Sequence, residues 1–391
     1  MINSQQPPLF PTFDSIESVL WPGIALAVFV VTAVLVDVLI LLAPRWQLVD
    51  HPNERSAHAL PTARGGGLSI VLTTALAALG VCLRWPQLLP AVLGGVIVPA
   101  LVIAAVGLID DIRPVKATLR LLIQIAMAIV VIAILGPLNS VDLPGIQTVQ
   151  LGWLGWPITI LWIVGLINAF NFMDGSDGMA ALGAVVVGGF MTLIGLQINN
   201  PALILMAAFA AAAGGGFLVF NWSPARVFMG DVGSAFLGIY FASLPLLIQE
   251  RERSVIFLPA VMALWPYVFD PLVSVIRRAC NGHNPLVPHR EFLFHRLIRS
   301  GVSHSWTALL YAVLAALGGV AGMVLADQEI AAEFRGLAAL CPVVLAGFLV
   351  LGIESRCRRV ALAAPPGEAL VCRTAPPLAG PAGQPTEQRS L

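Results

Sequence analysis

The chain has 391 residues, of which 58% are hydrophobic and only 11% charged, and its mean hydropathy is +0.89. Soluble domains carry roughly a quarter charged residues, so this composition excludes an ordinary soluble domain and indicates a polytopic membrane protein. The formal net charge is zero, so the overall charge does not suggest a nucleic-acid partner.

Eleven apolar segments approach the length of about 17–25 residues that a helix needs to cross a bilayer. They lie at 20–44, 67–83, 90–109, 119–136, 156–170, 179–197, 202–220, 234–248, 256–276, 306–326 and 334–353. The second, fifth and eighth are short. The sequence therefore predicts an all-α transmembrane bundle of ten or eleven spans.

The loops between these segments alternate between two sides of the membrane. One side, counted with Arg120, carries 17 of the 21 lysines and arginines. It comprises 45–66, 110–118, 171–178, 221–233, 277–305 and the tail after 354. By the positive-inside rule this side is cytoplasmic, which places the N-terminus in the periplasm and the C-terminus in the cytoplasm.

Three regions of the chain follow from this pattern. Residues 1–19 form a periplasmic segment, residues 20–353 form the transmembrane domain, and residues 354–391 form a cytoplasmic tail. The tail is rich in Pro, Gly and Ala, a composition typical of disorder. The longest outer loop, 137–155, is expected to form a short hairpin.

Acids and amides collect in the predicted cytoplasmic loops. The stretch "GLIDD" ends the third span with Asp110 and Asp111, and "NWSPARVFMGDVGS" supplies Asn221 and Asp231. Between them, "NAFNFMDGSDG" supplies four polar side chains, which are Asn168, Asn171, Asp174 and Asp177. Carboxylates at the ends of membrane helices are costly unless they are solvated or paired, and they mark functional sites by default.

Basic side chains lie in two further loops on the same side. They are Arg55, His58 and Arg64 in "NERSAHALPTARGGG", and His289, Arg290, His295 and Arg296 in "PHREFLFHRL". Carboxylates with amide oxygens suit Mg²⁺, with Mn²⁺ as an alternative, and the cations suit phosphate groups. Acids for a metal and cations for an anion together indicate phosphoryl transfer.

Each motif also has a plainer interpretation. The paired Asp110 and Asp111 could end a helix, Asp174 or Asp177 could cap the sixth span, and Asp231 could cap the eighth. The arginines could serve membrane orientation alone. Two acids lie at membrane depth: Asp37 is given a structural role, whereas Asp270 is either structural or paired with an arginine near the inner surface.

Five motifs together resemble a known family. They are "DHPNERSAHALPTARGGG", "GLIDD", "NAFNFMDGSDGMA", "FNWSPARVFMGDVGS" and "PHREFLFHRL", and they extend over about 48–305. In order and in loop placement they resemble the bacterial polyprenyl-phosphate N-acetylhexosamine-1-phosphate transferases of glycosyltransferase family 4. This family includes the undecaprenyl-phosphate GlcNAc-1-phosphate transferases and the phospho-N-acetylmuramoyl-pentapeptide transferase.

The resemblance implies a multi-pass enzyme of the bacterial inner membrane. Its acceptor would be undecaprenyl phosphate, its donor a UDP-N-acetylhexosamine, and its products polyprenyl-diphospho-sugar and UMP. The resemblance also implies roles for individual residues: Asp231 and Asn171 at Mg²⁺, Asp110 and Asp111 by the lipid phosphate with one as base, Asp174 by the metal or diphosphate, Asp177 by the uridine, Asn221 lining the cleft, and Arg120 near the phosphates. The sequence leaves a homodimer open.

The last motif departs from the family pattern. Phe292 and Phe294 stand where many relatives have histidines, while His289 and His295 remain. This form is similar to the subset that starts O-antigen or other surface-polysaccharide repeats, and it argues against a muropeptide donor. Two other functions are weighed beside the transferase: a lipid-phosphate hydrolase or another lipid-linked phosphotransferase, and a transporter or flippase.

Overall fold

The computed structural model describes residues 15–45, 49–50, 61–144, 147–280, 282 and 292–363, and this part of the chain is predominantly helical. The α-helices are α1 Ser15–Leu42, α2 Gly67–Arg84, α3 Val98–Ile112, α4 Ala117–Leu135, α5 Gly155–Met173, α6 Met179–Gln197, α7 Pro201–Asn221, α8 Asp231–Ser243, α9 Glu250–Cys280, α10 Leu293–Arg299, α11 His304–Ala326, α12 Ala332–Ala339 and α13 Cys341–Ala363. Shorter or wider turns of helix are η1 Pro86–Leu88, η2 Pro90–Ile97, η3 Gly152–Leu154 and η4 Leu244–Leu247.

Ten helical segments of the described chain are long and apolar enough to cross a membrane. They are Leu20–Leu42, Gly67–Arg84, Pro86–Ile112, Ala117–Leu135, Gly152–Met173, Met179–Gln197, Pro201–Asn221, Glu252–Cys280, His304–Ala326 and Ala332–Val360. The predicted helical bundle is confirmed. The eighth predicted span falls on a shorter apolar segment, Asp231–Leu247, whereas the orientation of the termini stays a prediction.

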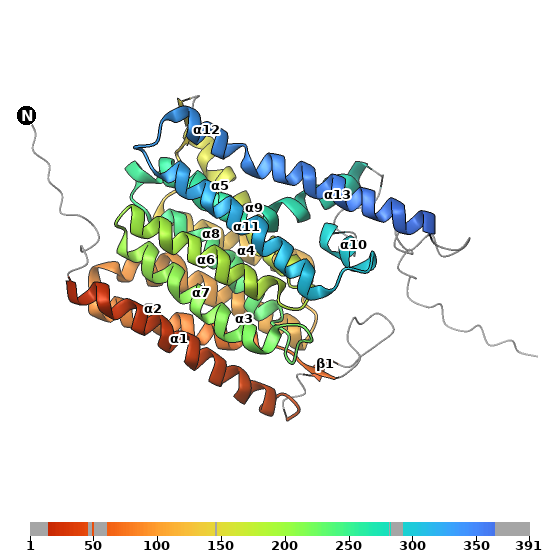
Figure 1. Ribbon diagram of the computed structural model, residues 1–391. Coiled ribbons are helices and arrows are strands. Elements are labelled where there is room, and N and C mark those ends of the chain that lie inside the picture. The colour runs from red at the N-terminus through yellow and green to blue at the C-terminus, as the bar shows by residue number, and fades with distance from the viewer. Residues whose placement is uncertain are drawn as a thin grey trace, which may run out of the picture.

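The short helix α8 lies at the centre of the bundle, and α1 and α13 lie at opposite edges (Figure 1). Every residue of α8 after Asp231 is buried, as expected for a helix that is apolar on all sides. Two glycines let neighbouring backbones approach it closely. A Cβ on Gly107 of α3 would lie 2.5 Å from the Asp231 carbonyl oxygen, and a Cβ on Gly238 would lie 2.5 Å from Cα of Ile167 in α5.

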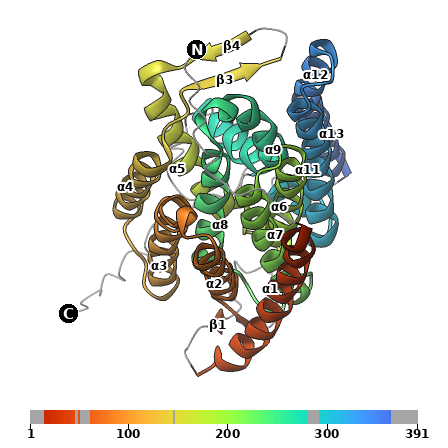
Figure 2. The same cartoon turned by 90° about the vertical axis from the view of Figure 1, so that its left-hand side faces the viewer.

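Two small antiparallel sheets complete the described structure. Strand β3, Ser140–Leu143, pairs with β4, Gln147–Gln150, so the hairpin predicted in the outer loop is confirmed. It lies at the edge of the bundle near α5 (Figure 2). Strand β1, Val49–Asp50, pairs with β2, Thr62–Ala63. An isolated parallel bridge then links Ala63 to Val227, in the segment before α8.

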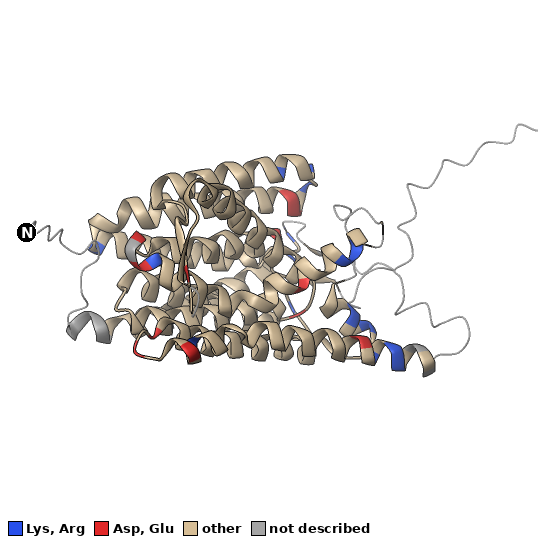
Figure 3. Ribbon diagram, turned by 90° about the horizontal axis from the view of Figure 1, so that it is seen from above, with Lys and Arg blue, Asp and Glu red and all other residues tan. Residues whose placement is uncertain are grey.

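Charged residues lie mainly towards the two ends of the bundle, and they leave most of each helix uncharged (Figure 3). At one of these ends the last turns of α3 and α5 meet the first turn of α8. We call this place the acidic end and define it by Asp110, Asp111, Asp174 and Asp231.

Candidate active site

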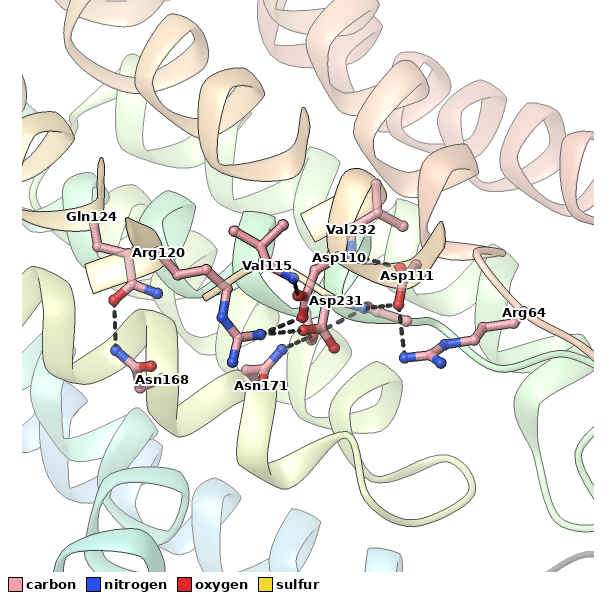
Figure 4. Close-up of polar contacts among 12 residues, drawn as sticks. Arg64, Asp110, Asp111, Val115, Arg120, Gln124, Asn168, Asn171, Asp231 and Val232 are labelled. Atoms are coloured by element: carbon pink, nitrogen blue, oxygen red, sulfur yellow. Dashed lines mark hydrogen bonds and ion pairs between the residues drawn. The ribbon is translucent and has the colours of Figure 1, made fainter. Parts of the chain in front are cut away.

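The start of α8 is held by a carboxylate from another helix. Asp111, at the end of α3, accepts hydrogen bonds from the backbone N–H groups of Asp231 at 3.1 Å and Val232 at 3.2 Å (Figure 4). The first N–H groups of a helix have no partner within the helix, and the positive end of the helix dipole favours an anion there. The Asp111 side chain is fully buried and also pairs with Arg64 at 2.8 Å.

Gly230 makes this arrangement sterically feasible. Its φ of 74° and ψ of 170° lie in a region that is essentially restricted to glycine. A Cβ at this position would lie 2.6 Å from Oδ2 of Asp111. The glycine that precedes Asp231 therefore allows the Asp111 carboxylate to reach the first turn of α8.

Arg120 joins two carboxylates of the acidic end. One guanidinium nitrogen of Arg120, in the first turn of α4, donates to Asp110 and also to Oδ2 of Asp231 at 3.1 Å. The other oxygen of Asp110 accepts the Val115 N–H at 2.6 Å. Side chains in this group are partly exposed, at 35% for Arg120, 23% for Asp231 and 15% for Asp110, so small ions and phosphate oxygens can approach them.

Two asparagines of α5 lie three residues apart and therefore share one helix face. Asn171 hydrogen-bonds to the Asp231 carboxylate and to the Ser234 hydroxyl at 3.3 Å, so it belongs to the site. Asn168 lies one turn further back and donates to Oε1 of Gln124 in α4 at 2.8 Å. It supports the α4–α5 contact at the edge of the same group of residues.

The loop 174–178 between α5 and α6 is attached to the segment that precedes α8. Asp174 accepts a hydrogen bond from the Gly230 backbone, and Asp177 accepts the Ala225 N–H at 3.2 Å. The motifs "NAFNFMDGSDGMA" and "FNWSPARVFMGDVGS" therefore lie against each other.

Asn221, the last residue of α7, joins the same two segments from inside. Its Oδ1 accepts the Gly178 N–H at 3.0 Å, and its Nδ2 donates to the Val227 carbonyl at 2.8 Å. The residue is buried. The hydrogen bonds of its carboxamide indicate that Asn221 positions both loops.

Burial and the neighbouring negative charges raise the pKa of two acids at this end. Burial raises the pKa of Asp174 well above its usual range, and the negative charges of Asp231 and Asp111 raise it further. Burial, together with the charge of Asp111, raises the pKa of Asp231 to about 6, although the hydrogen bond from Asn171 opposes this change. A bound cation would relieve this repulsion, because an opposite charge favours the ionised form of a carboxyl group.

The glycine-rich segment around Arg64 is folded onto the strand before α8. The N–H groups of Gly66 and Gly67 donate to the carbonyl oxygens of Phe228 at 3.0 Å and Met229 at 2.9 Å. A Cβ on Gly67 would lie 2.5 Å from Cα of Gly233, so this close approach requires glycine. The result places Arg64 beside Asp111 with 40% of its side chain exposed, where it can meet an anion.

Helix α10 carries the last predicted group of site residues. Its residue Arg296 forms hydrogen bonds to Glu354 of α13 at 2.8 and 3.2 Å and therefore binds away from the acidic end. His295 stacks on Phe294 with 4.0 Å between ring centroids, and Phe292 stacks on Phe294 at 5.9 Å. Both phenylalanines are buried, so their role is packing. Arg55, His58, His289 and Arg290 lie outside the described residues.

Sequence analysis missed one contact of the loop 174–178. The Ser176 hydroxyl lies 2.9 Å from Nδ1 of His304, the first residue of α11, and the two form a hydrogen bond. No motif singles out His304, because it follows the last recognised one by several residues. Only the packing of α11 against the bundle brings it to the loop.

The residues present fit a divalent cation that is shared with substrate. Within the described residues, no three or more His, Cys, Asp and Glu side chains are placed to hold a metal ion by themselves. Asp231 and Asp110 instead offer carboxylate oxygens in one place, and Asn171 lies beside them and donates its amide NH2 to Asp231. Mg²⁺ commonly takes one or two carboxylates and fills its other positions with water and substrate phosphates.

Comparisons with known proteins match the chain to one family. The family model described as glycosyl transferase family 4 matches residues 93–249. A decaprenyl-phosphate N-acetylglucosaminephosphotransferase of Mycobacterium leprae is 30% identical over 302 residues, which cover 69% of this chain and 75% of the relative.

Two further relatives have related activities. A probable undecaprenyl-phosphate N-acetylglucosaminyl 1-phosphate transferase of Bacillus subtilis is 29% identical over 285 residues, covering 72% of this chain and 78% of the relative. A phospho-N-acetylmuramoyl-pentapeptide-transferase of Clostridium beijerinckii is 35% identical over 104 residues, covering 27% and 30%. The chain belongs to glycosyltransferase family 4, the family of polyprenyl-phosphate N-acetylhexosamine-1-phosphate transferases.

Proposed function

We propose that the protein transfers a phospho-N-acetylhexosamine from a UDP-sugar to undecaprenyl phosphate and so initiates O-antigen or another surface polysaccharide. An oxygen of the lipid phosphate attacks the β-phosphorus of the donor. The bond between this phosphorus and the oxygen that bridges to the α-phosphate breaks, and UMP leaves. The products are polyprenyl-diphospho-sugar and UMP.

The observation that carries this proposal is the convergence of acids, amides and two arginines at the acidic end. Phosphoryl transfer depends on positioning and on neutralising charge as it shifts between oxygens. Arg64 and Arg120 lie 2.8 Å and 3.1 Å from carboxylates and still have exposed surface, so they can also contact phosphate oxygens. When bound, Mg²⁺ would neutralise phosphate charge, and Asp231 would hold it together with the amide oxygen of Asn171, once the amide turns from its donor position beside Asp231.

The geometry separates the roles of Asp110 and Asp111. The side chain of Asp111 is fully buried, and its two oxygens bond to the start of α8 and to Arg64. The side chain of Asp110 is partly exposed and contacts Arg120, which also pairs with Asp231. Asp110 is therefore the better group to face the lipid phosphate and accept its proton, whereas Asp111 holds the site together.

Membrane placement follows the same proposal. The arginine-rich side of the chain would face the cytoplasm of a bacterium, where UDP-sugars are available, and the bundle would lie in the inner membrane. The acceptor's hydrocarbon tail then stays in the bilayer while its phosphate reaches the acidic end.

A direct assay tests the reaction. Purified protein in detergent is incubated with radiolabelled UDP-GlcNAc, undecaprenyl phosphate and Mg²⁺, and then with a panel of other UDP-N-acetylhexosamines. Labelled lipid together with UMP is the expected result. Release of free sugar phosphate, or no nucleotide turnover with any donor, would favour a hydrolase or a transporter.

A matched pair of variants tests the site itself. Asp231→Asn is expected to lose nearly all turnover while remaining folded, because the amide removes the negative charge that a metal and Arg120 both require. Asp142→Asn is the control, since Asp142 lies in the β3–β4 hairpin, where its carboxylate accepts a hydrogen bond from the Thr148 hydroxyl at 3.1 Å. Full activity in Asp231→Asn would remove Asp231 from the reaction.

A further inference from the structure

Helix α10 lies against the loop 174–178, which joins α5 to α6 and which we call the acidic loop. A Cβ on Gly175 would lie 3.2 Å from Cζ of Phe294 and 3.4 Å from Nε2 of His295. The stacked pair of aromatic rings therefore rests on the residue between Asp174 and Ser176. Any shift of α10 would change the space that this loop occupies, because packed interiors yield little.

The beginning of α10 is held by a buried carboxylate of α9. Asp270 has no exposed surface and accepts hydrogen bonds from the backbone N–H groups of Leu293 at 2.6 Å and Phe294 at 3.0 Å. These are the first two residues of α10, and the residue before them, Phe292, supplies no cap. Asp270 thus caps α10 from another helix and satisfies N–H groups that would otherwise lack partners.

Two hydroxyl groups fix the position of this carboxylate. Tyr311 of α11 donates to Oδ2 of Asp270 at 2.6 Å, and Ser274 donates to Oδ1 at 3.1 Å. A buried carboxylate is costly unless it is fully hydrogen-bonded, and four donors meet this requirement here. The sequence left open a pairing of Asp270 with an arginine, but the capping interaction is what the structure contains.

The end of α10 is fixed separately by α13. Glu354 accepts hydrogen bonds from Arg296 of α10 and from Arg277 of α9, the latter at 2.8 Å. Nε of Arg356, also in α13, donates to the Ser300 hydroxyl at 2.9 Å. The short helix is therefore held at both ends, and its position does not depend on its own marginal length.

We propose that Asp270 is a positioning residue of the transferase site, and that it sets the acidic loop by fixing α10 against Gly175. The proposal rests on the proposed function for its kinetic consequences. Asp270 contacts no substrate in this scheme. It holds the N–H groups of Leu293 and Phe294 at the start of α10. The rings of Phe294 and His295 then contact the acidic loop at Gly175. The same loop is hydrogen-bonded to Gly230 and Ala225.

The test compares two Tyr→Phe variants, each of which removes one buried hydroxyl group. Tyr311→Phe removes a donor to Asp270, whereas Tyr240→Phe removes a donor to the Met206 carbonyl at 2.9 Å, between α8 and α7. Tyr311→Phe is expected to lower kcat/KM for the UDP-sugar about tenfold, with the KM for undecaprenyl phosphate unchanged, because a charge-assisted hydrogen bond is lost. Tyr240→Phe is expected to keep both kinetic constants.

Hydrogen–deuterium exchange provides a readout that needs no turnover. Peptides covering 174–178 and 292–299 are expected to exchange faster in Tyr311→Phe than in the wild type, and at the wild-type rate in Tyr240→Phe. Asp270→Asn should show the same pattern more strongly, and if it fails to fold the tyrosine pair still decides the question. If the enzyme assay itself fails, exchange still tests the positioning.

If Asp270 only stabilises the fold and does not influence the site, a different outcome is expected. Tyr311→Phe would then lower thermal stability as Tyr240→Phe does, while exchange in 174–178 and the donor KM and kcat of the folded protein stay at wild-type values. That result would overturn the proposal.

Discussion

Replacement of Gly230 by alanine should weaken the connection between α3 and α8 at the acidic end. The alanine Cβ would lie 2.6 Å from Oδ2 and 3.1 Å from Cγ of Asp111. An ordinary contact begins near 3.4 Å, so the carboxylate has to retreat by roughly 0.8 Å. The bond that Oδ2 accepts from the Val232 N–H, at 3.2 Å, would then exceed hydrogen-bonding distance.

The expected cost has two parts. A non-glycine residue held at the backbone angles of Gly230 costs about 1–3 kcal/mol. Loss of one hydrogen bond to a charged group adds about 1.5–3 kcal/mol. The sum is about 3–6 kcal/mol, divided between folding and the transition state. We therefore expect a lower thermal unfolding temperature and a fall of about a hundredfold or more in kcat/KM, since about 1.4 kcal/mol corresponds to tenfold.

The assay is transfer of labelled sugar phosphate to undecaprenyl phosphate, with thermal unfolding followed on the same preparation. Gly80→Ala is the control, because Gly80 lies within α2 and nothing surrounds its missing Cβ within 4 Å. This control should keep activity and stability, or gain about 0.5–1 kcal/mol of stability. Activity within twofold of wild type in Gly230→Ala, at an unchanged unfolding temperature, would refute the role of Asp111 in holding α8.

Three further predictions concern the loops, the opposite end of the bundle and pH. Asn221→Ala leaves the buried Gly178 N–H and Val227 carbonyl without their partner, at about 1–3 kcal/mol each, so unfolding temperature and activity should both fall. Arg253→Met removes bonds to the carbonyls of Leu135 and Leu246, and calorimetry should show lower stability with unchanged substrate KM values. Because the pKa of Asp231 is raised to about 6, protons should compete with Mg²⁺ below that pH, and metal titrations should show a rising Mg²⁺ requirement from pH 7.5 to 5.5.

The direction of the pH effect on folding is opposite to that on metal binding. An aspartate with a raised pKa binds a proton more readily in the folded than in the unfolded protein, so without metal this group stabilises the fold more as pH falls towards 4. Unfolding temperatures measured with a chelator should show a smaller decline on acidification in the wild type than in Asp231→Asn. An identical pH profile in the two proteins would contradict the raised pKa.

Hydropathy alone predicted most of the fold, since a membrane-spanning helix must be apolar over nearly its whole length. Ten of the predicted segments match candidate spans, and the eighth proved shorter. Its burial explains the difference. Helix α8 contacts other helices on all sides, so its composition resembles a span although its length does not.

The residues of the candidate site could be predicted from the sequence, but many of their contacts could not. Acids at helix ends indicated Asp110, Asp111, Asp174 and Asp231, because such residues are costly within a membrane protein unless they have a function. The partners of Arg296 and Asp270 were not predictable. Arg296 binds a residue 58 positions away, and Asp270 binds backbone groups 23 and 24 positions away, so both depend on tertiary packing rather than on local pattern.

The adjacent acids Asp110 and Asp111 show why a motif cannot assign chemical roles. Consecutive residues of a helix point about 100° apart, so a pair of aspartates at a helix end must face different surroundings. Here Asp111 turns inward to the first turn of α8, and Asp110 turns towards Arg120 and is more exposed. We therefore expect the inward acid to hold the site together and the outward acid, which is partly exposed, to face substrate. Asparagine at Asp111 should therefore lower stability and activity together, whereas asparagine at Asp110 should lower activity alone.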